Sequence, residues 1–240
     1  MIQKRTFPES KQLSLEPDRK KLRTVHEIVR AVQHEIVPPL QEITRAPAEL
    51  PDPSETVSPD EFFLKLVKAQ CNLEFKVKPA QELTNFFSPG TEEQIAAYTS
   101  DVVSAARTNN VEALKELTAQ GKTLNCLNRF GESLVHMACR RGFYEMVDFL
   151  LEQPGVSVRI VDDCGRTVLH DCCWNPSPQL EICKRVMELE PALFLVSDRR
   201  GFTPFQYARP EHWKAWRHFL FENRETLSRL SEPETLEHFL

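Results

Sequence analysis

The chain has 240 residues, of which 41% are hydrophobic, and this is enough apolar material for a folded core. Its net charge of −5 argues against a nucleic-acid-binding domain, because such domains carry a basic excess. There is no run of 18 apolar residues and no apolar core near the N-terminus, so neither a membrane span nor a secretory signal is predicted. We therefore expect a cytoplasmic or nuclear protein with reduced cysteines.

Residues 1–90 are expected to form a proline-rich, partly disordered region, because ten of the 17 prolines lie there. Two amphipathic helices are predicted within it, near residues 19–37 and 59–70. Pro38 and Pro39 end the first helix, and Ser58 can cap the second. Either helix could dock on a partner or pack back on the rest of the chain, and the sequence favours neither.

Three similar phrases follow, each with a turn glycine near its start. They read RFGESLVHMA from Arg129, DCGRTVLHDC from Asp163 and RRGFTPFQYA from Arg199. In each phrase a hydroxyl residue stands two positions after the glycine, and His or Gln stands five positions after it. The glycines are 34 and 36 residues apart, and recurrence at a period of 20 to 50 residues indicates a repeat architecture that buries its core by stacking.

These phrases resemble the ankyrin repeat, whose signature is a glycine turn followed by T-P-L-H and two small residues. The resemblance implies an all-α solenoid of about four helix-turn-helix units with short hairpin turns over residues 91–225, followed by a C-terminal helical tail at 226–240. The first unit lacks the glycine phrase and is expected to be the N-terminal cap. The Trp-rich last helix either seals the other end or offers a partner an aromatic anchor. Structural roles in the turns are implied for Gly131, His136, Gly142, Gly165, His170 and Gly201.

The same resemblance implies that a partner binds in the concave groove between the hairpin tips and the inner helices. By motif position, the partner-binding residues are expected to be Arg129, Phe130, Arg140, Arg141, Arg166, Asp171, Trp174, Arg199, Arg200, Phe202 and Tyr207. Arginine and aromatic side chains dominate this set, and both are enriched at interface hot spots. We therefore expect a non-enzymatic protein–protein interaction module, an adaptor or regulator, with an acidic or phosphorylated segment as one candidate ligand. The alternative is that these arginines are simply solvated.

No motif in the sequence indicates catalysis or cofactor binding. The sequence holds no phosphate-binding loop, G-x-S-x-G or H-E-x-x-H, so we expect no catalysis and no cofactor. Two alternatives remain: a nucleic-acid-associated transcriptional regulator that uses the arginines, and a metal or redox protein that uses the cluster from His170 to Cys173. Because no C-x-x-C pair occurs and Cys172 and Cys173 occupy small-residue positions of the motif, packing is their expected role and no metal site is predicted.

Overall fold

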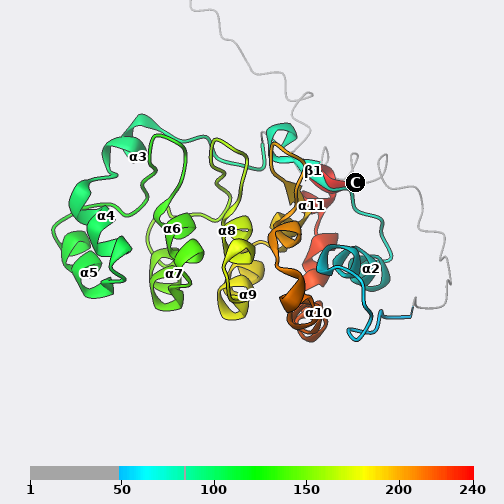
Figure 1. Cartoon of the computed structure of the whole chain (residues 1–240). Coiled ribbons are helices and arrows are strands. Elements are labelled where there is room, and N and C mark those ends of the chain that lie inside the picture. The colour runs from blue at the N-terminus through cyan, green and yellow to red at the C-terminus, as the bar shows by residue number, and fades with distance from the viewer. Residues whose placement is uncertain (1–48, 84) are drawn as a thin grey trace, which may run out of the picture. The chain divides into compact units, whose positions relative to one another are not determined.

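Pairs of helices joined by short turns lie side by side in the middle of the chain (Figure 1). The pairs are α4 (Ser100–Arg107) with α5 (Val111–Ala119), α6 (Leu134–Arg141) with α7 (Tyr144–Leu151), and α8 (Val168–Trp174) with α9 (Leu180–Leu189). This computed structural model describes residues 49–83 and 85–240. The predicted helical repeat solenoid is confirmed, whereas the helix predicted near residues 19–37 lies outside the described residues.

Helix caps set where the first, or inner, helix of each pair begins and ends. Ser133 and Thr167 each form a capping box with the histidine three residues later. Such caps satisfy main-chain N–H groups that the first helical turn leaves without partners. At the other end, Gly142 (φ 71°) stops α6 and Asn109 (φ 53°) turns the chain after α4. Both residue types tolerate this left-handed conformation, and a structural role in the turn was expected for Gly142.

A hairpin fastened by one side chain precedes α6, α8 and the corresponding segment of the last unit. Its first residue is Asn128, Asp162 or Asp198, and the side-chain Oδ1 accepts the main-chain N–H groups two and four residues later, at 2.8–3.0 Å. The turn glycine then takes a positive φ, 81° at Gly131. A Cβ at Gly131 would lie 2.9 Å from the Val161 carbonyl oxygen, so glycine is required there by conformation and by space.

Hydrogen bonds join neighbouring hairpins in a row. The main-chain N–H of Asp163 donates to the Phe130 carbonyl (2.7 Å), and that of Arg199 donates to the Cys164 carbonyl (2.9 Å). The buried ring of His170 adds a third link, because its Nε2 lies 3.0 Å from the Phe202 carbonyl oxygen. His136 makes the equivalent bond to the Arg166 carbonyl at 3.2 Å. The three glycine phrases thus stack as one row of turns.

The last unit departs from the pattern. Pro204 begins a 3-10 turn, η3 (Pro204–Tyr207), in place of a full inner helix. Gln206 accepts the Thr203 N–H at 2.8 Å, which reproduces the cap made by histidine in the earlier units. A second 3-10 turn, η4 (Pro210–His212), leads into α10 (Trp213–Glu222), whose Trp216 is 1% exposed. The Trp-rich helix is therefore mainly core.

The boundary expected near residue 90 does not coincide with any separation in the structure, since residues 47–240 form one compact unit. Helix α2 (Pro59–Cys71) packs against α10 and the C-terminal segments. The ring of Phe63 lies 5.5 Å from that of Phe194 and 5.9 Å from that of Phe205. Five phenylalanines in residues 62–87, all at most 9% exposed, give this segment enough apolar surface to join the core despite its prolines.

Polar contacts also hold α2 and the residues before it against the last unit. The Thr203 hydroxyl donates to Asp60 Oδ1 (2.5 Å), and the buried Arg217 guanidinium donates to the carbonyls of Pro53 (3.1 Å) and Val57 (2.8 Å). Helix α2 thus covers the apolar side of the last unit, the side on which a further repeat would otherwise stack. Residues 226–240 likewise form no separate tail. Their segments, η5 (Arg224–Ser231) and α11 (Pro233–Phe239), bury Leu227, Leu230 and Phe239 completely.

From α2 the chain returns along the hairpins to the first unit. Strand β1 (Lys78–Pro79) pairs in parallel with β2 (Val196–Ser197), which follows the 3-10 segment η2 (Pro191–Leu195). After the 3-10 turn η1 (Ala80–Glu82), the Ser88 N–H donates to the Arg159 carbonyl at 3.2 Å. Beyond α3 (Glu92–Ala96), the Leu127 N–H donates to the Gln94 carbonyl at 3.1 Å. Within the described residues, no helix is both long and apolar enough to cross a membrane.

Replacing Phe63 with Ala should lower the free energy of unfolding by about 3–5 kcal/mol, because it leaves a cavity beside Phe194 and Phe205. Urea unfolding of the full chain measures this loss. The exposed neighbour Lys65 is the control, and Lys65→Ala should change the midpoint little. Equal, small effects of the two substitutions would contradict the view that α2 belongs to the core.

A second prediction concerns pH. Burial lowers the pKa of His170 from 6.5 to about 4. The unfolded chain therefore binds a proton on this ring before the folded chain does, and stability should fall as the pH falls from 6.5 towards 4. At pH 7, His170→Gln should be less stable than wild type, because Gln cannot reach the Phe202 carbonyl in the same way. By pH 4.5 that gap should shrink by about 2–3 kcal/mol, measured by urea unfolding. A gap that is independent of pH would show that the ring is not buried in its neutral form.

Candidate functional site

The hairpin tips and the inner helices together carry the expected partner-binding residues. A recess of about 130 Å³ lies among them, lined by Arg140, Arg166, His170, Asp171, Trp174 and Tyr207. All six come from α6, α8, η3 or the second hairpin, so consecutive units build one surface. We use the name groove for this recess together with the hairpin tips and helix ends that border it.

Arg140 is held in place by two carboxylates from different units. Its Nε and Nη2 donate to the two oxygens of buried Asp171 at 3.0 Å each, and its Nη2 also pairs with Glu132. Hydrogen bonding to Asp171 raises the pKa of this guanidinium above its usual value. Arg140 thus bridges the first hairpin and α8, and its charge is largely neutralised within the chain.

Arg166 and Arg200 also form ion pairs with carboxylates of this chain. Arg166 donates through Nε to Asp162 Oδ2 at 2.7 Å, and the Asp162 side chain is 1% exposed. Arg200 donates to the Tyr207 hydroxyl (2.8 Å), and that hydroxyl donates to Asp198 Oδ2 (2.6 Å). Asp162 and Asp198 therefore fasten a hairpin with one oxygen and hold a groove side chain with the other.

Arg129, Arg141 and Arg199 differ from these arginines. All three are exposed, and none forms an ion pair with a residue that the structure describes. Arg129 and Arg199 stand on the tips of the first and third hairpins, and Arg141 ends α6. The uncompensated positive charge of the groove accordingly lies at its rim.

Exposed aromatic rings form the apolar part of the groove. Phe130 is 45% exposed, Trp174 is 55% exposed and Phe202 is 43% exposed. The guanidinium of Arg129 lies 4.6 Å from the centre of the Phe130 ring, and that of Arg200 lies 5.1 Å from the centre of the Phe202 ring. Large apolar side chains left in water on one face mark a candidate contact surface.

Asp162 and Asp198, which pair with Arg166 and Arg200, were not among the site residues expected from the sequence, whereas Asp171 was expected there as a partner-binding residue. Asp162 and Asp198 each stand three residues before a turn glycine, as Asn128 does before Gly131. That spacing, N/D-x-x-G, was the available signal, since Asn and Asp side chains often bond to the main chain two residues on in turns.

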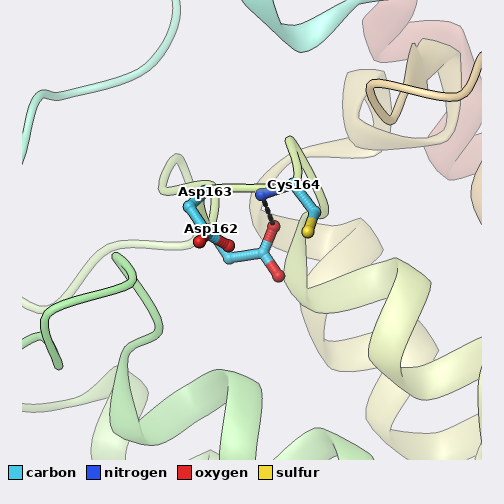
Figure 2. A group of neighbouring side chains, drawn as sticks. All are labelled: Asp162, Asp163 and Cys164. Carbon is cyan, nitrogen blue, oxygen red and sulfur yellow. Dashed lines mark hydrogen bonds between the residues drawn. The ribbon is translucent and has the colours of Figure 1, made fainter.

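One group of possible metal ligands occurs in the described residues: Asp162, Asp163 and Cys164 (Figure 2). Asp162 Oδ1 accepts the N–H groups of Cys164 (2.9 Å) and Arg166 (2.8 Å), and Oδ2 faces the Arg166 guanidinium. A cation would have to replace these bonds and approach Arg166. The arrangement fits a capped turn better than a metal centre.

Four of the five buried cysteines lie in the repeat helices: Cys139, Cys172, Cys173 and Cys183. Burial raises the pKa of their thiols, well above the usual value for Cys139, Cys172 and Cys183. Metals and disulfide exchange require the thiolate, so this environment disfavours both kinds of chemistry. Packing stays the predicted role of Cys172 and Cys173.

Comparisons with known proteins agree with the repeat fold. Residues 102–195 match the family model for ankyrin repeats in three copies. An ankyrin repeat protein of Rickettsia bellii (strain RML369-C) is 22% identical over 108 residues, which are 45% of this chain and 58% of that protein. The chain therefore matches less than two thirds of that relative's length. Residues 102–195 coincide with the stacked helix pairs, and we conclude that this chain carries ankyrin repeats.

Proposed function

We propose that this protein is a non-enzymatic protein–protein interaction module, an adaptor or regulator that holds a segment of a partner in the groove. Ankyrin repeats are in general modules that bind other proteins. The single observation that carries the proposal is the set of exposed rings, Phe130, Trp174 and Phe202, beside a recess built by consecutive units. A cytoplasmic or nuclear location, expected from the sequence, would keep the buried thiols reduced.

The groove favours a ligand with an apolar anchor and flanking acidic or phosphorylated residues. The anchor would contact Trp174, whose indole has the largest exposed fraction of the three rings. Arg129 and Arg199 are free to bond carboxylate or phosphate oxygens, because no internal acid occupies them in the described residues. Arg140, Arg166 and Arg200 would instead keep the surface in one shape, because each is bonded within the chain.

A peptide selected by display on the immobilised full-length protein provides the probe for two tests. Trp174→Ala should weaken its binding by about 2 kcal/mol, or about 30-fold in Kd, mainly through faster dissociation. Surface plasmon resonance measures both rates. Tyr144→Ala removes a comparably exposed ring (43%) from the outer helix α7 and should leave Kd unchanged. Equal losses in the two variants would place the binding site elsewhere.

The double reversal Arg129→Glu, Arg199→Glu should slow association of an acidic selected peptide about tenfold at low salt and flatten its dependence on ionic strength. Lys184→Glu is the matched control, since Lys184 is an exposed cation on the outer helix α9. Arg140→Glu should instead destabilise the fold, because it would face Glu132 and Asp171. An unchanged association rate in the rim double variant would show that these arginines do not contact the ligand.

A further inference from the structure

The turn between α8 and α9 is longer than its counterpart in the preceding unit. Two residues, Gly142 and Phe143, separate α6 from α7, whereas five residues, 175–179, separate α8 from α9. The spacing of the turn glycines reflects part of this change, since it rises from 34 to 36 residues. Insertions in repeat proteins map to loops on one face, often the binding face, and this one directly follows Trp174.

The longer turn presents Ser177 between two prolines. Pro178 restricts Ser177 to an extended conformation, and neither Pro176 nor Pro178 has a main-chain N–H. The Ser177 N–H donates to Asn175 Oδ1 at 3.1 Å, within the same turn. Ser177 is exposed, and its hydroxyl has no hydrogen-bond partner among the described residues. An incoming enzyme could therefore bind this segment as an extended chain and reach the hydroxyl with few bonds to break.

Three other hydroxyl residues precede a proline in this sequence, and each is more engaged. The Ser58 oxygen caps α2 by accepting the Glu61 N–H at 3.2 Å. Thr203 is buried, and its hydroxyl donates to Asp60. Ser88 is exposed, but its N–H is bonded to the Arg159 carbonyl and the preceding Phe87 is buried. Ser177 alone of the four combines an exposed, unbonded hydroxyl with a backbone that is bonded only within its own turn.

Basic groups border the turn on both sides. The His212 ring bonds to the Pro176 carbonyl at 3.0 Å, and Asn175 Nδ2 donates to the Arg140 carbonyl at 3.1 Å, which places Arg141 next to the turn. Arg141 is exposed and unpaired within the described part of the chain. The nearby acidic residues, Glu181 and Glu211, are both exposed to solvent. A dianionic group on Ser177 would thus find an arginine partner.

From these observations we propose that Ser177 is a phosphorylation site for a proline-directed protein kinase. In this step the Ser177 Oγ attacks the γ-phosphorus of ATP, an Oγ–P bond forms, and the bond from that phosphorus to the β-phosphate bridging oxygen breaks. ADP leaves, and the hydroxyl proton passes to the catalytic base of the kinase. The prolines favour a kinase whose substrate cleft needs no main-chain N–H donor at the position after the serine.

Phosphorylation would also regulate the groove, a consequence that rests on the proposed function. The phosphoryl group adds a charge of about −1.5 to −2 three residues from Trp174. It would compete for Arg141 and repel an acidic ligand, so binding of that ligand should weaken. A ligand without acidic residues should be affected much less.

The test treats the folded full-length protein with purified proline-directed kinases and Mg-ATP, and locates the phosphate by peptide mass spectrometry. We expect one phosphoryl group on Ser177, which is lost in S177A and added several-fold more slowly in P178A. S88A, which removes the other exposed serine before a proline, should be modified as wild type is. All variants are first compared with wild type by circular dichroism and urea unfolding, so that loss of fold is not read as loss of the site.

Phosphate on Ser58 or Ser88 instead, or on Ser177 only after heat unfolding, would overturn the proposal, and so would the absence of any modification. Binding of the selected acidic peptide is then compared between the unmodified and the phosphorylated protein. If Ser177 is modified but the peptide binds equally well, the modification stands and its effect on the groove is refuted. If no selected peptide depends on Trp174, the groove proposal fails independently of the kinase result.

Discussion

The structure depends above all on one bond that is made twice, from a buried histidine ring to the next hairpin. The Thr167 N–H donates to Nδ1 of His170, so the neutral ring carries its proton on Nε2 and donates it to the Phe202 carbonyl. His136 repeats the arrangement with Ser133 and Arg166. Each ring thus caps its own helix and fixes the next turn, so the local structure of one unit is tied to the position of its neighbour.

A stack held together in this way has an open end, and the end is closed by residues from far away in the chain. In the last unit, Gln206 caps its own turn by accepting the Thr203 N–H, and among the described residues its side chain has no bond to another hairpin. Helix α2 covers the apolar surface at this end of the stack. The segment that follows α2 returns along the hairpins to the first unit. The contacts from Asp60 to Thr203 and from Val57 to Arg217 join segments that are 143 and 160 residues apart in the chain, so they tie α2 and the residues before it to the last unit.

The same hairpins decide the electrostatics of the groove. A buried carboxylate is stabilised only when charged or polar groups surround it, and here turn N–H groups and arginines serve Asp162, Asp171 and Asp198. Arginines that the sequence places in the groove are therefore of two kinds. Those near a buried acid maintain the shape of the surface, while Arg129, Arg141 and Arg199 keep their charge available at the rim. The exposed rings between them supply the apolar contact.

The sequence by itself determined the repeats. Each glycine phrase needs a glycine with a positive φ, a hydroxyl cap two residues later and a histidine or glutamine three residues after that. These requirements depend only on residues that are close together in the sequence, so the sequence reveals them. The same reasoning predicted the turn at Gly142 and a helix near residues 59–70, which the structure has at Pro59–Cys71. Motif position also predicted that Arg140, Arg166, Asp171, Trp174 and Tyr207 share one surface, and these five side chains line the same recess.

Only the tertiary structure decided what that surface is made of and how the stack ends. The partners of Arg140 are 8 and 31 residues away, and their distance follows from the stacking of units rather than from any local pattern. Outside the helix predicted near residues 59–70, the proline-rich segment from 49 to 90 did not resemble a core, because its apolar residues have no sustained period. It is ordered because its apolar side chains are buried against the last repeat. That burial offsets the loss of chain entropy even where the apolar residues have no period.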